Sequence, residues 1–508
     1  MAVLIGRTLA WLSLMSTDAR PITVLTDSER RAVLRDGLAL ISGAQVATAL
    51  GAIASVVLRA AVAPTLMGIW STMRTVLEYG TYSSFGINRA AGRDIAVATG
   101  RGDTALKRQI ADVAMTNEVG TGLIVASALV VAGFVQAARG SAEWAAACAV
   151  AALLAVVGRY HGFCLTVLRS TKNFPVLAQA RAVGAVADLV LMAGGAVAFG
   201  YFGLLAGAAA AQLLNASFVR SIGRLRFAPR LDHGLTQALI LGGWPIAAEA
   251  LALTALRSVD RLVIVGWLSD GAEQLGWYSV AMLLAAWLFD QANLVANVIY
   301  PRQAESLGRS GDRVGVVALG LGTAEVIALA MAPCSALLLG PGTLVIDWLL
   351  PSYRPGLTAA SGLVIGAAAL GVAMPLRYSL VTLGRTPAML LATVLAALSS
   401  LAGAYWFATH EGTLVHIALS SAAAATFCLV LMVTLCCAAG GPIRSAVRVC
   451  VAVVYAFGGA MALGPAHDAN LGVWFAGAAA WCAGPMVLLA QRLVSRPLCA
   501  GDHGKDPS

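Results

Sequence analysis

Residues 66–71 read LMGIWS, and residues 274–279 read QLGWYS. Each stretch joins a glycine to aromatic and serine side chains inside a strongly apolar run. The two glycines, Gly68 and Gly276, lie 208 positions apart. Aromatic residues gather at many membrane–water interfaces, so one such likeness could arise by chance. The decision between a repeat and a coincidence therefore depends on whether a second marker keeps the same spacing.

A second pair of motifs does keep it. GRGD begins at Gly100, which is 32 residues after Gly68, and GRSGD begins at Gly308, which is 32 residues after Gly276. Two markers in one register predict an internal repeat. We expect each motif to mark an equivalent position in two halves of the molecule.

The composition places both halves in a membrane. The chain has 508 residues, of which 59% are hydrophobic and only 12% are charged, and its mean hydropathy is +0.81. Soluble proteins carry about a quarter charged residues. Apolar runs of about 20 residues, enough for a helix to cross a bilayer, recur along the chain. Segments that alternate as a β-barrel requires do not occur, and only helices or barrels satisfy their backbone in lipid. The sequence predicts an all-α polytopic membrane protein.

We predict about 14 transmembrane helices. The second is the least typical, because it carries Arg74 and Glu78. The predicted spans are residues 37–60, 66–88, 110–135, 142–168, 176–199, 201–221, 238–268, 273–298, 314–340, 358–381, 388–409, 413–438, 444–463 and 470–491.

The repeat divides these spans into two parallel six-helix lobes plus two C-terminal helices. An offset of six spans is even, so both lobes have the same orientation, as in transporter folds with a site between parallel repeats. The predicted division is an N-terminal tail at 1–36, a first lobe at 37–221, a linker at 222–237, a second lobe at 238–438, two helices at 439–491 and a C-terminal tail at 492–508.

The basic residues set the orientation, because cytoplasmic loops retain Lys and Arg. One set of loops and tails holds 27 of the 34 basic residues, whereas the opposite loops hold Arg59, Arg139 and Arg354. Both termini are therefore expected in the cytoplasm. This bias accounts for the net charge of +9, so no nucleic-acid partner is expected. The first residues lack a cleavage site typical of a signal peptide, and Met15 is an alternative first residue.

Enzyme chemistry finds no support in the sequence. The nine cysteines are scattered, mostly within apolar spans, and the six histidines form no cluster. Such cysteines usually serve packing, and their spacing matches no metal site. The loops contain no phosphate-binding motif, nucleophile motif or paired catalytic carboxylates. We expect no cofactor and no metal.

Several stretches resemble a known family. LRAAVAPTLMGIWS and EYGTYSSFGINRAAGRDIAVATGRGD are similar to the first hairpin of bacterial polysaccharide-biosynthesis membrane proteins. SVDRLVIVGWLSDGAEQLGWYS, YPRQAESLGRSGD and LLPSYRPG resemble later segments of the same proteins. These are the lipid-linked oligosaccharide flippases of the multidrug/oligosaccharidyl-lipid/polysaccharide (MOP) exporter superfamily. The resemblance covers roughly residues 35–385 and consists of loose motifs.

The resemblance implies two six-helix lobes around a central cavity. It also implies that undecaprenyl-diphosphate-linked oligosaccharide moves from the cytoplasmic to the periplasmic leaflet of the bacterial inner membrane by alternating access. Polysaccharide polymerase and assembly proteins would then be the expected partners, besides membrane lipid. The alternative within the superfamily is an ion-coupled multidrug and toxin extruder, which usually has twelve spans. A polysaccharide polymerase or glycosyltransferase is a third alternative, disfavoured by the short external loop at 341–357.

Charged residues inside the predicted spans mark the candidate site. A lone charge at mid-bilayer costs about 2.5–3.5 kcal/mol on insertion scales, so most must pair or line a wet cavity. The embedded set is Arg74, Arg159, Arg257 and Arg261 with Glu78, Glu118, Asp188, Glu249, Asp260, Asp290 and Glu325. None of this embedded set lies beyond residue 330.

We predict that the four arginines bind the anionic substrate, because a guanidinium fork suits a diphosphate. By rise per residue, Arg74 and Arg257 lie at similar depth, about 12 Å and about 16 Å from the external ends of their helices. Arg159 lies in the inner half of its span and could receive the headgroup first. Two structural alternatives stay open: a local ion pair of Arg74 with Glu78, and a pair of Asp260 with Arg261.

The embedded acids outnumber the bases. Carboxylates within membranes often carry protons in pumps and transporters. Proton or sodium coupling is therefore predicted for a set of six acids, some of which would instead be structural partners of the arginines. The set is Glu78, Glu118, Asp188, Glu249, Asp290 and Glu325.

Overall fold

The computed structural model describes residues 47–171, 173–410, 412–463 and 471–494. Within these ranges, ten helices are long and apolar enough to cross a membrane, and shorter apolar helices cover Ala47–Ala61 and Trp474–Leu488. The described ranges contain no strand. The prediction of an all-α, multi-pass membrane protein is confirmed. The predicted tail at 1–36, the start of the first span and nearly all of the tail at 492–508 lie outside the described residues.

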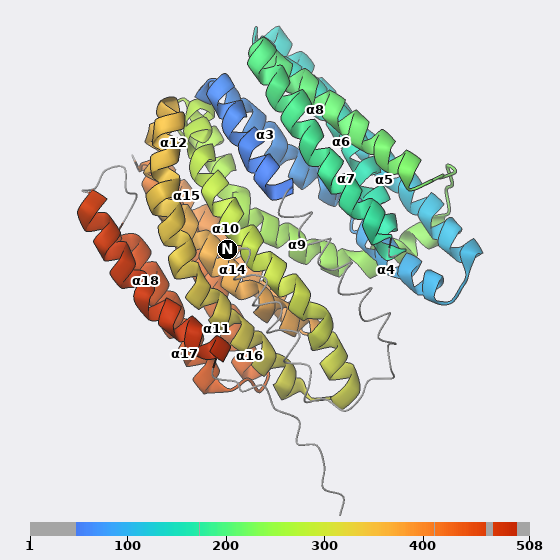
Figure 1. Ribbon diagram of the computed structural model, residues 1–508. Helices are drawn as coiled ribbons and strands as arrows, with labels where there is room; N and C mark the ends of the chain where they lie inside the picture. Colours follow the sequence, from blue (N-terminus) through green and yellow to red (C-terminus); the bar gives the residue numbers. More distant parts are fainter. Residues whose placement is uncertain (1–46, 172, 411, 464–470, 495–508) are drawn as a thin grey trace, which may run out of the picture.

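The first lobe lies on the right of Figure 1 and begins with the helix Ala47–Ala61. Its further elements are α3 (Pro64–Gly80), η1 (Thr81–Ser84), α4 (Ile87–Gly100), α5 (Thr104–Ala138), α6 (Ala142–Ser170), α7 (Phe174–Ala187), η2 (Asp188–Ala193) and α8 (Gly194–Ile222). A kink at Phe199 and Gly200 separates the fifth and sixth predicted spans.

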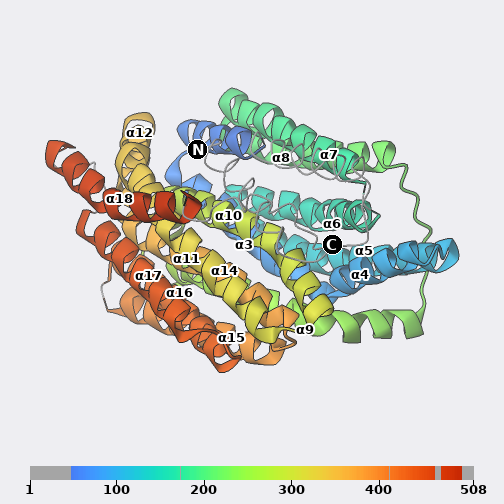
Figure 2. The same ribbon diagram turned by 60° about the horizontal axis from the view of Figure 1, so that its bottom comes forward.

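The second lobe is built around α14 (Ala360–Thr382). Among the ten spanning helices, α14 has the largest fraction of its residues buried inside the protein. Two further helices, α17 (Ile443–Leu463) and α18 (Leu471–Val494), pack against α11 on the side away from the first lobe (Figures 1 and 2). The elements of the lobe are α9 (His233–Trp267), α10 (Gly271–Ser310), α11 (Arg313–Leu337), η3 (Leu338–Gly342), α12 (Thr343–Leu349), η4 (Pro351–Tyr353), α13 (Arg354–Leu357), α14 (Ala360–Thr382), α15 (Thr386–Thr409) and α16 (Leu414–Ala438).

The two lobes repeat the same helix contacts. In the first lobe, α6 packs against α3, α5 and α8; in the second, α14 packs against α10, α11 and α16. These are the helices that the 208-residue spacing relates to one another. Each lobe thus buries its own apolar helix faces around one central helix, and the internal repeat has a structural counterpart.

The two repeated motifs meet at the point where the lobes cross. A Cβ atom on Gly68 would overlap the backbone carbonyl of Ala272, and one on Gly276 would overlap the carbonyl of Pro64. Only glycine permits this close approach of α3 and α10. The motif glycines therefore share a structural role, because they bring the two lobes into backbone contact near the N-terminal ends of α3 and α10.

Two sets of hydrogen bonds between helices lie beside this crossing. Arg59 donates hydrogen bonds from Nε to Ser279 Oγ and from Nη2 to Ser279 O, both at 3.1 Å. The Tyr353 hydroxyl donates to Val62 O at 2.6 Å. Arg59 is only 8% exposed, so its prediction as an external-loop residue was wrong. It lies within the predicted first span and anchors that helix to α10.

The second predicted span is interrupted. The prediction of one helix over 66–88 was wrong, because α3 ends at Gly80 and α4 starts at Ile87. Phe85 and Gly86 have φ values of 51° and 85°, in the left-handed region. A side chain on Gly86 would overlap Gly243 of α9. The break therefore serves a second close crossing of the lobes, between α4 and α9.

The linker between the lobes is fastened to α5. Ala228 N donates to Asp112 Oδ1 and Arg230 N donates to Thr116 Oγ1, each at 2.9 Å. Asp232 caps α9 by accepting from Leu235 N at 3.0 Å. This bond, supported by Gln109, lowers the pKa of the Asp232 carboxyl. The start of α9 is thus held against the first lobe, while the rest of α9 packs on α15.

We expect Gly276→Ala to loosen the contact between α3 and α10. The added methyl group must displace the Pro64 carbonyl, and overpacking of this kind costs about 1–3 kcal/mol. Hydrogen–deuterium exchange at residues 64–71 and 272–279 should then be faster by about fivefold or more. Gly266→Ala is the matched control, because a Cβ there meets nothing within 4 Å. Unchanged exchange in the Gly276 variant would contradict the assigned role.

Candidate functional site

Side chains from both lobes meet along α3 and α9. Ser258 Oγ donates to Tyr79 Oη at 3.0 Å, and the hydroxyls of Tyr82 and Thr254 share a hydrogen bond of 2.7 Å. One turn further along, Arg261 Nη1 lies 3.9 Å from Glu78 Oε2. The side chain of Glu78 is 44% exposed and that of Arg261 is 20% exposed. This contact between the lobes is therefore polar and partly hydrated.

Six charged residues gather around this contact, and we call them the interlobe cluster. Arg74 interacts electrostatically with Arg261, Asp188 and Glu78. Arg257 interacts with Arg261, Glu78 and Asp290. The cluster therefore contains three arginines and three carboxylates, contributed by α3, η2, α9 and α10: Arg74, Glu78, Asp188, Arg257, Arg261 and Asp290.

The cluster joins residues that the sequence predicted separately. Arg74 and Arg257 share Glu78 and Arg261 as electrostatic neighbours, although they belong to different lobes. Their predicted similar depth agrees with this arrangement. The predicted local pair of Arg74 with Glu78 is not the direct contact found, because the carboxylate of Glu78 lies against Arg261 of the other lobe.

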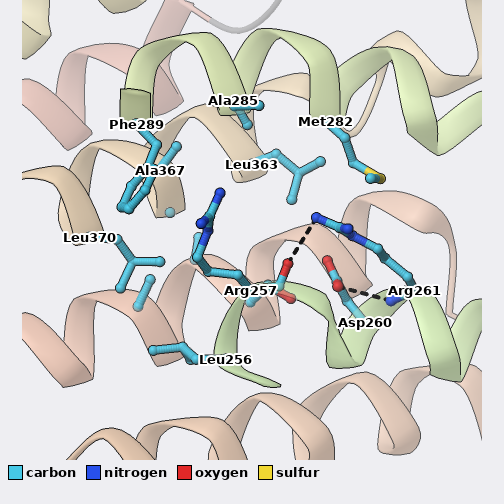
Figure 3. A pocket seen from close by; sticks show the side chains of 15 residues that line it. Leu256, Arg257, Asp260, Arg261, Met282, Ala285, Phe289, Leu363, Ala367 and Leu370 are labelled. Carbon is cyan, nitrogen blue, oxygen red and sulfur yellow. Dashed lines mark hydrogen bonds between the residues drawn. The ribbon is translucent and has the colours of Figure 1, made fainter. Parts of the chain in front are cut away.

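Arg257 lies beside a small cavity inside the second lobe (Figure 3). Its guanidinium carbon lies 4.0 Å from the centre of the Phe289 ring, a cation–π contact. The cavity has a volume of about 70 Å³ and is lined by α9, α10, α14 and α16. Pockets that enclose drug-sized ligands measure roughly 300–1,000 Å³. This cavity can therefore receive only a small part of a large substrate.

Arg261 is oriented by its own helix. Its Nη2 donates to Arg257 O at 3.2 Å, and its backbone N donates to Asp260 Oδ1 at 2.9 Å (Figure 3). The other carboxylate oxygen of Asp260 accepts from the Tyr278 hydroxyl at 2.6 Å. Asp260 thus contacts Arg261 through the Arg261 backbone, and within the described residues the two side chains form no ion pair. Tyr278 belongs to the QLGWYS motif, so the motif also fixes this turn of α9.

Arg159 lies apart from the cluster, in the interior of the first lobe. It lies 3.5 Å from Glu118, and it donates to Gly80 O and to Ser83 Oγ. Both side chains of the pair are about 5% exposed or less. The guanidinium thus bonds to a backbone carbonyl at the point where α3 ends. Arg159 and Glu118 therefore stabilise the break between α3 and α4.

Two more of the predicted acids have partners within the second lobe. Glu249 of α9 forms an ion pair with Arg377 of α14, and both are buried. Glu325 of α11 lies 3.4 Å from Arg448 of α17. Arg377 was one of the 27 basic residues assigned to the cytoplasmic loops and tails, which was wrong, because it is buried inside α14. The available signal was its position inside the predicted span 358–381, where the apolar run continues beyond it.

Asp188 and Asp290 differ from the other acids. Within the described residues, neither has an ion pair with a nitrogen atom within 4.0 Å, and each interacts with one arginine at longer range. Asp188 begins the π-helical turn η2, a type of irregularity that often occurs at functional sites. Asp290 is exposed. These two carboxylates are the least constrained of the six.

The site has no arrangement suited to a bound metal. Within the described residues, no group of three or more His, Cys, Asp or Glu side chains could hold an ion. What the cluster offers is a set of guanidinium donors from two lobes, with carboxylates that balance their charge. Such a site can bind an anionic group and exchange its ionic partners when the group arrives.

Known structures share this fold. The lipid II flippase MurJ in an inward closed conformation superposes with a TM-score of 0.63 at 11% identity, covering 90% of this chain and 98% of that one. A multidrug transporter of the MATE family in complex with MaL6 gives 0.55 at 12% identity, with 83% and 96% covered. A MOP-superfamily transporter from Pyrococcus furiosus gives 0.52 at 13% identity, with 80% and 96% covered. At these identities the likeness concerns the fold.

Sequence comparison supplies the family. No curated protein sequence matches the chain significantly. A family model described as polysaccharide biosynthesis protein matches residues 95–353, just over half of the chain. This confirms the resemblance seen in the motifs, and both the family and the fold support a transporter rather than an enzyme. The chain belongs to the polysaccharide biosynthesis protein family and has the fold of the MOP-superfamily transporters.

Proposed function

We propose that this protein flips undecaprenyl-diphosphate-linked oligosaccharide from the cytoplasmic to the periplasmic leaflet by alternating access. The product would serve exopolysaccharide, capsule or O-antigen synthesis. One observation carries the proposal: Arg74 of one lobe and Arg257 and Arg261 of the other form a single electrostatic cluster between the lobes, in a chain of the polysaccharide biosynthesis family.

The chemistry of the cluster suits a lipid diphosphate. A diphosphate offers several anionic oxygens in a compact group, and guanidinium forks bind such oxygens in pairs at fixed geometry. Without substrate, the three carboxylates of the cluster balance the arginines. Phosphate oxygens would replace them as partners, which releases Glu78 from Arg261. Arg159 is not part of this proposed site, because its donors already serve the first lobe.

Binding at this place would couple to movement of the lobes. At the N-terminal ends of α3 and α10, which the proposed orientation places outside, the lobes are held together by the glycine crossing and by the hydrogen bonds of Arg59 and Tyr353. A ligand shifts a conformational equilibrium only by binding one state better than the other. A diphosphate that contacts arginines of both lobes favours the state in which those arginines converge on it.

The proposed setting is the bacterial inner membrane. The excess of Arg and Lys on one set of loops favours cytoplasmic termini, with the polysaccharide polymerase and assembly proteins as further partners. In this orientation, the crossing of α3 and α10 lies on the periplasmic side of the interface between the lobes.

The alternative is an ion-coupled multidrug extruder of the same superfamily. It is favoured by the three carboxylates in the interlobe cluster, which could attract a cationic drug, and by the MATE-family structural neighbours. The two functions differ in the sign of the charge that the cluster binds. Binding of an anionic lipid diphosphate therefore distinguishes them directly.

We expect Arg257→Gln to reduce transport of lipid-linked oligosaccharide in proteoliposomes by about 10-fold or more. Hydrogen bonds to charged groups contribute about 1.5–3 kcal/mol each, and 1.4 kcal/mol corresponds to a tenfold change. Leaflet sidedness would be measured with a membrane-impermeant sugar probe. The control is Arg354→Gln, which removes an exposed guanidinium paired with Asp347 away from the cluster. If the wild-type protein exported cationic drugs and did not bind the lipid-linked oligosaccharide, the result would instead support the multidrug extruder.

We further propose that Asp188 and Asp290 carry the coupling ion, whereas Glu118, Glu249 and Glu325 are structural. Asp188→Asn or Asp290→Asn should remove the dependence of transport on a proton or sodium gradient without lowering thermal stability. Glu249→Gln should lower thermal stability, because breaking a buried ion pair costs about 3–5 kcal/mol. The measurements are gradient-driven transport and melting in detergent. If transport by both Asp variants still depended on the gradient, the coupling role of these two residues would be refuted. The variant Glu78→Gln tests in the same way whether the acid that bridges the lobes carries the coupling ion.

A further inference from the structure

A polar face of α10 extends from the interlobe cluster toward the cytoplasmic end of that helix. It begins at Asp290 and continues with Asn293, Asn297 and Tyr300. At 100° per residue these positions lie within one third of the helix circumference. Asp290, Asn297 and Tyr300 are exposed. Since Asp290 interacts with Arg257 of the cluster, the face starts at the interlobe site and not on an unrelated side of the helix.

A tyrosine from the neighbouring helix completes this face. The Tyr378 hydroxyl on α14 donates to Asn297 Oδ1 at 2.8 Å. The rings of Tyr300 and Tyr378 lie 4.9 Å apart between centroids, tilted by 38°. Two aromatic rings and an amide are thus held together, and Tyr300 remains 37% exposed. The Tyr378–Asn297 bond fixes the amide so that its NH₂ group stays available as a donor.

Packing alone does not account for these groups. Tyrosines at the level of lipid headgroups are common, but Tyr378 is partly buried and packs against the hydrophobic core. In addition, the Oδ1 atom of Asn293 has no hydrogen-bond partner within the described residues. Buried polar atoms are normally satisfied, so this acceptor is unused by the protein in this state.

We propose that Asn293, Asn297, Tyr300 and Tyr378 form a sugar-binding subsite for the oligosaccharide. The inference rests on the proposed function, because the subsite extends the diphosphate site. Sugar rings present C–H faces that pack on aromatic rings and hydroxyls that bond to amides and carboxylates. From Asp290 to Tyr300 the helix rises about 15 Å, a distance that a short oligosaccharide can span. The diphosphate would lie at the interlobe cluster and the sugars along α10.

The test compares two lipids that differ only in the sugar. Binding to the purified full-length protein would be measured in detergent by microscale thermophoresis. One probe is undecaprenyl diphosphate without sugar, and the other is undecaprenyl-diphosphate-linked oligosaccharide extracted from the native bacterial strain. The variants are Tyr300→Leu, which removes a ring, and Tyr378→Phe, which removes only the hydroxyl bound to Asn297. Tyr405→Leu is the matched control, because Tyr405 pairs with Trp267 elsewhere, at 5.6 Å between ring centroids.

Tyr300→Leu should weaken binding of the oligosaccharide-linked lipid by about 10-fold and leave undecaprenyl diphosphate unaffected, and Tyr378→Phe should show the same pattern with a smaller loss. The Tyr405 variant should bind both lipids as the wild type does. The inference is overturned if both variants bind the oligosaccharide-linked lipid normally, or if they lose both lipids equally. If the wild-type protein bound neither of the two lipids, the proposed function would be overturned instead.

Discussion

A charge inside a bilayer needs either an opposite charge or water, and this requirement organises the polar interior of the protein. Glu118 pairs with Arg159 inside the first lobe, and Glu249 pairs with Arg377 inside the second. These buried pairs neutralise charge within one lobe. Each lobe can therefore move as a unit without exposing an unpaired buried charge to lipid. The interlobe cluster is different, because it includes the contact of Glu78 with Arg261 across the interface, where both side chains are partly exposed.

That difference explains why the site lies between the lobes. A pair such as Glu78 and Arg261 is partly exposed and separated by 3.9 Å, so little is lost when a stronger anion replaces the carboxylate. A buried pair such as Glu249 and Arg377 could not be separated at comparable cost. Charges that must exchange partners during transport are thus placed where water reaches them, and charges that hold helices together are placed where it does not.

The glycine contacts between the lobes fit the same distinction between contacts at the interface and contacts inside a lobe. At Gly68 and Gly276, and again at Gly86 and Gly243, the lobes touch through backbone atoms. Within the lobes, by contrast, α14 is enclosed by its neighbours and packs against α10, α11 and α16. Contacts between glycines can separate without pulling interdigitated side chains apart, whereas a close-packed core resists such change. The glycine contacts thus bring the backbones of the two lobes together at two places, beside a hydrophobic core that both lobes share.

The sequence by itself determined the membrane setting, the helices and the repeat. Hydropathy is a property of consecutive residues, so most of the apolar helices could be located without a structure, and two motif pairs at one spacing predicted the paired lobes. It also predicted Arg74 and Arg257 as embedded charges at similar depth, and the structure brings both arginines into one electrostatic cluster. It failed at the break after Gly80, because the turn at Phe85 and Gly86 is shaped by contact with α9.

Only the tertiary structure decided which charges act together. Arg159 and Arg257 look alike as embedded arginines, yet one is enclosed by Glu118, Gly80 and Ser83 and the other lies at the interlobe cluster. Arg377 was misplaced in a loop because its partner Glu249 is far away in the chain. Pairing depends on helix rotation and on which helices are neighbours, and both are set by packing among distant segments rather than by local sequence.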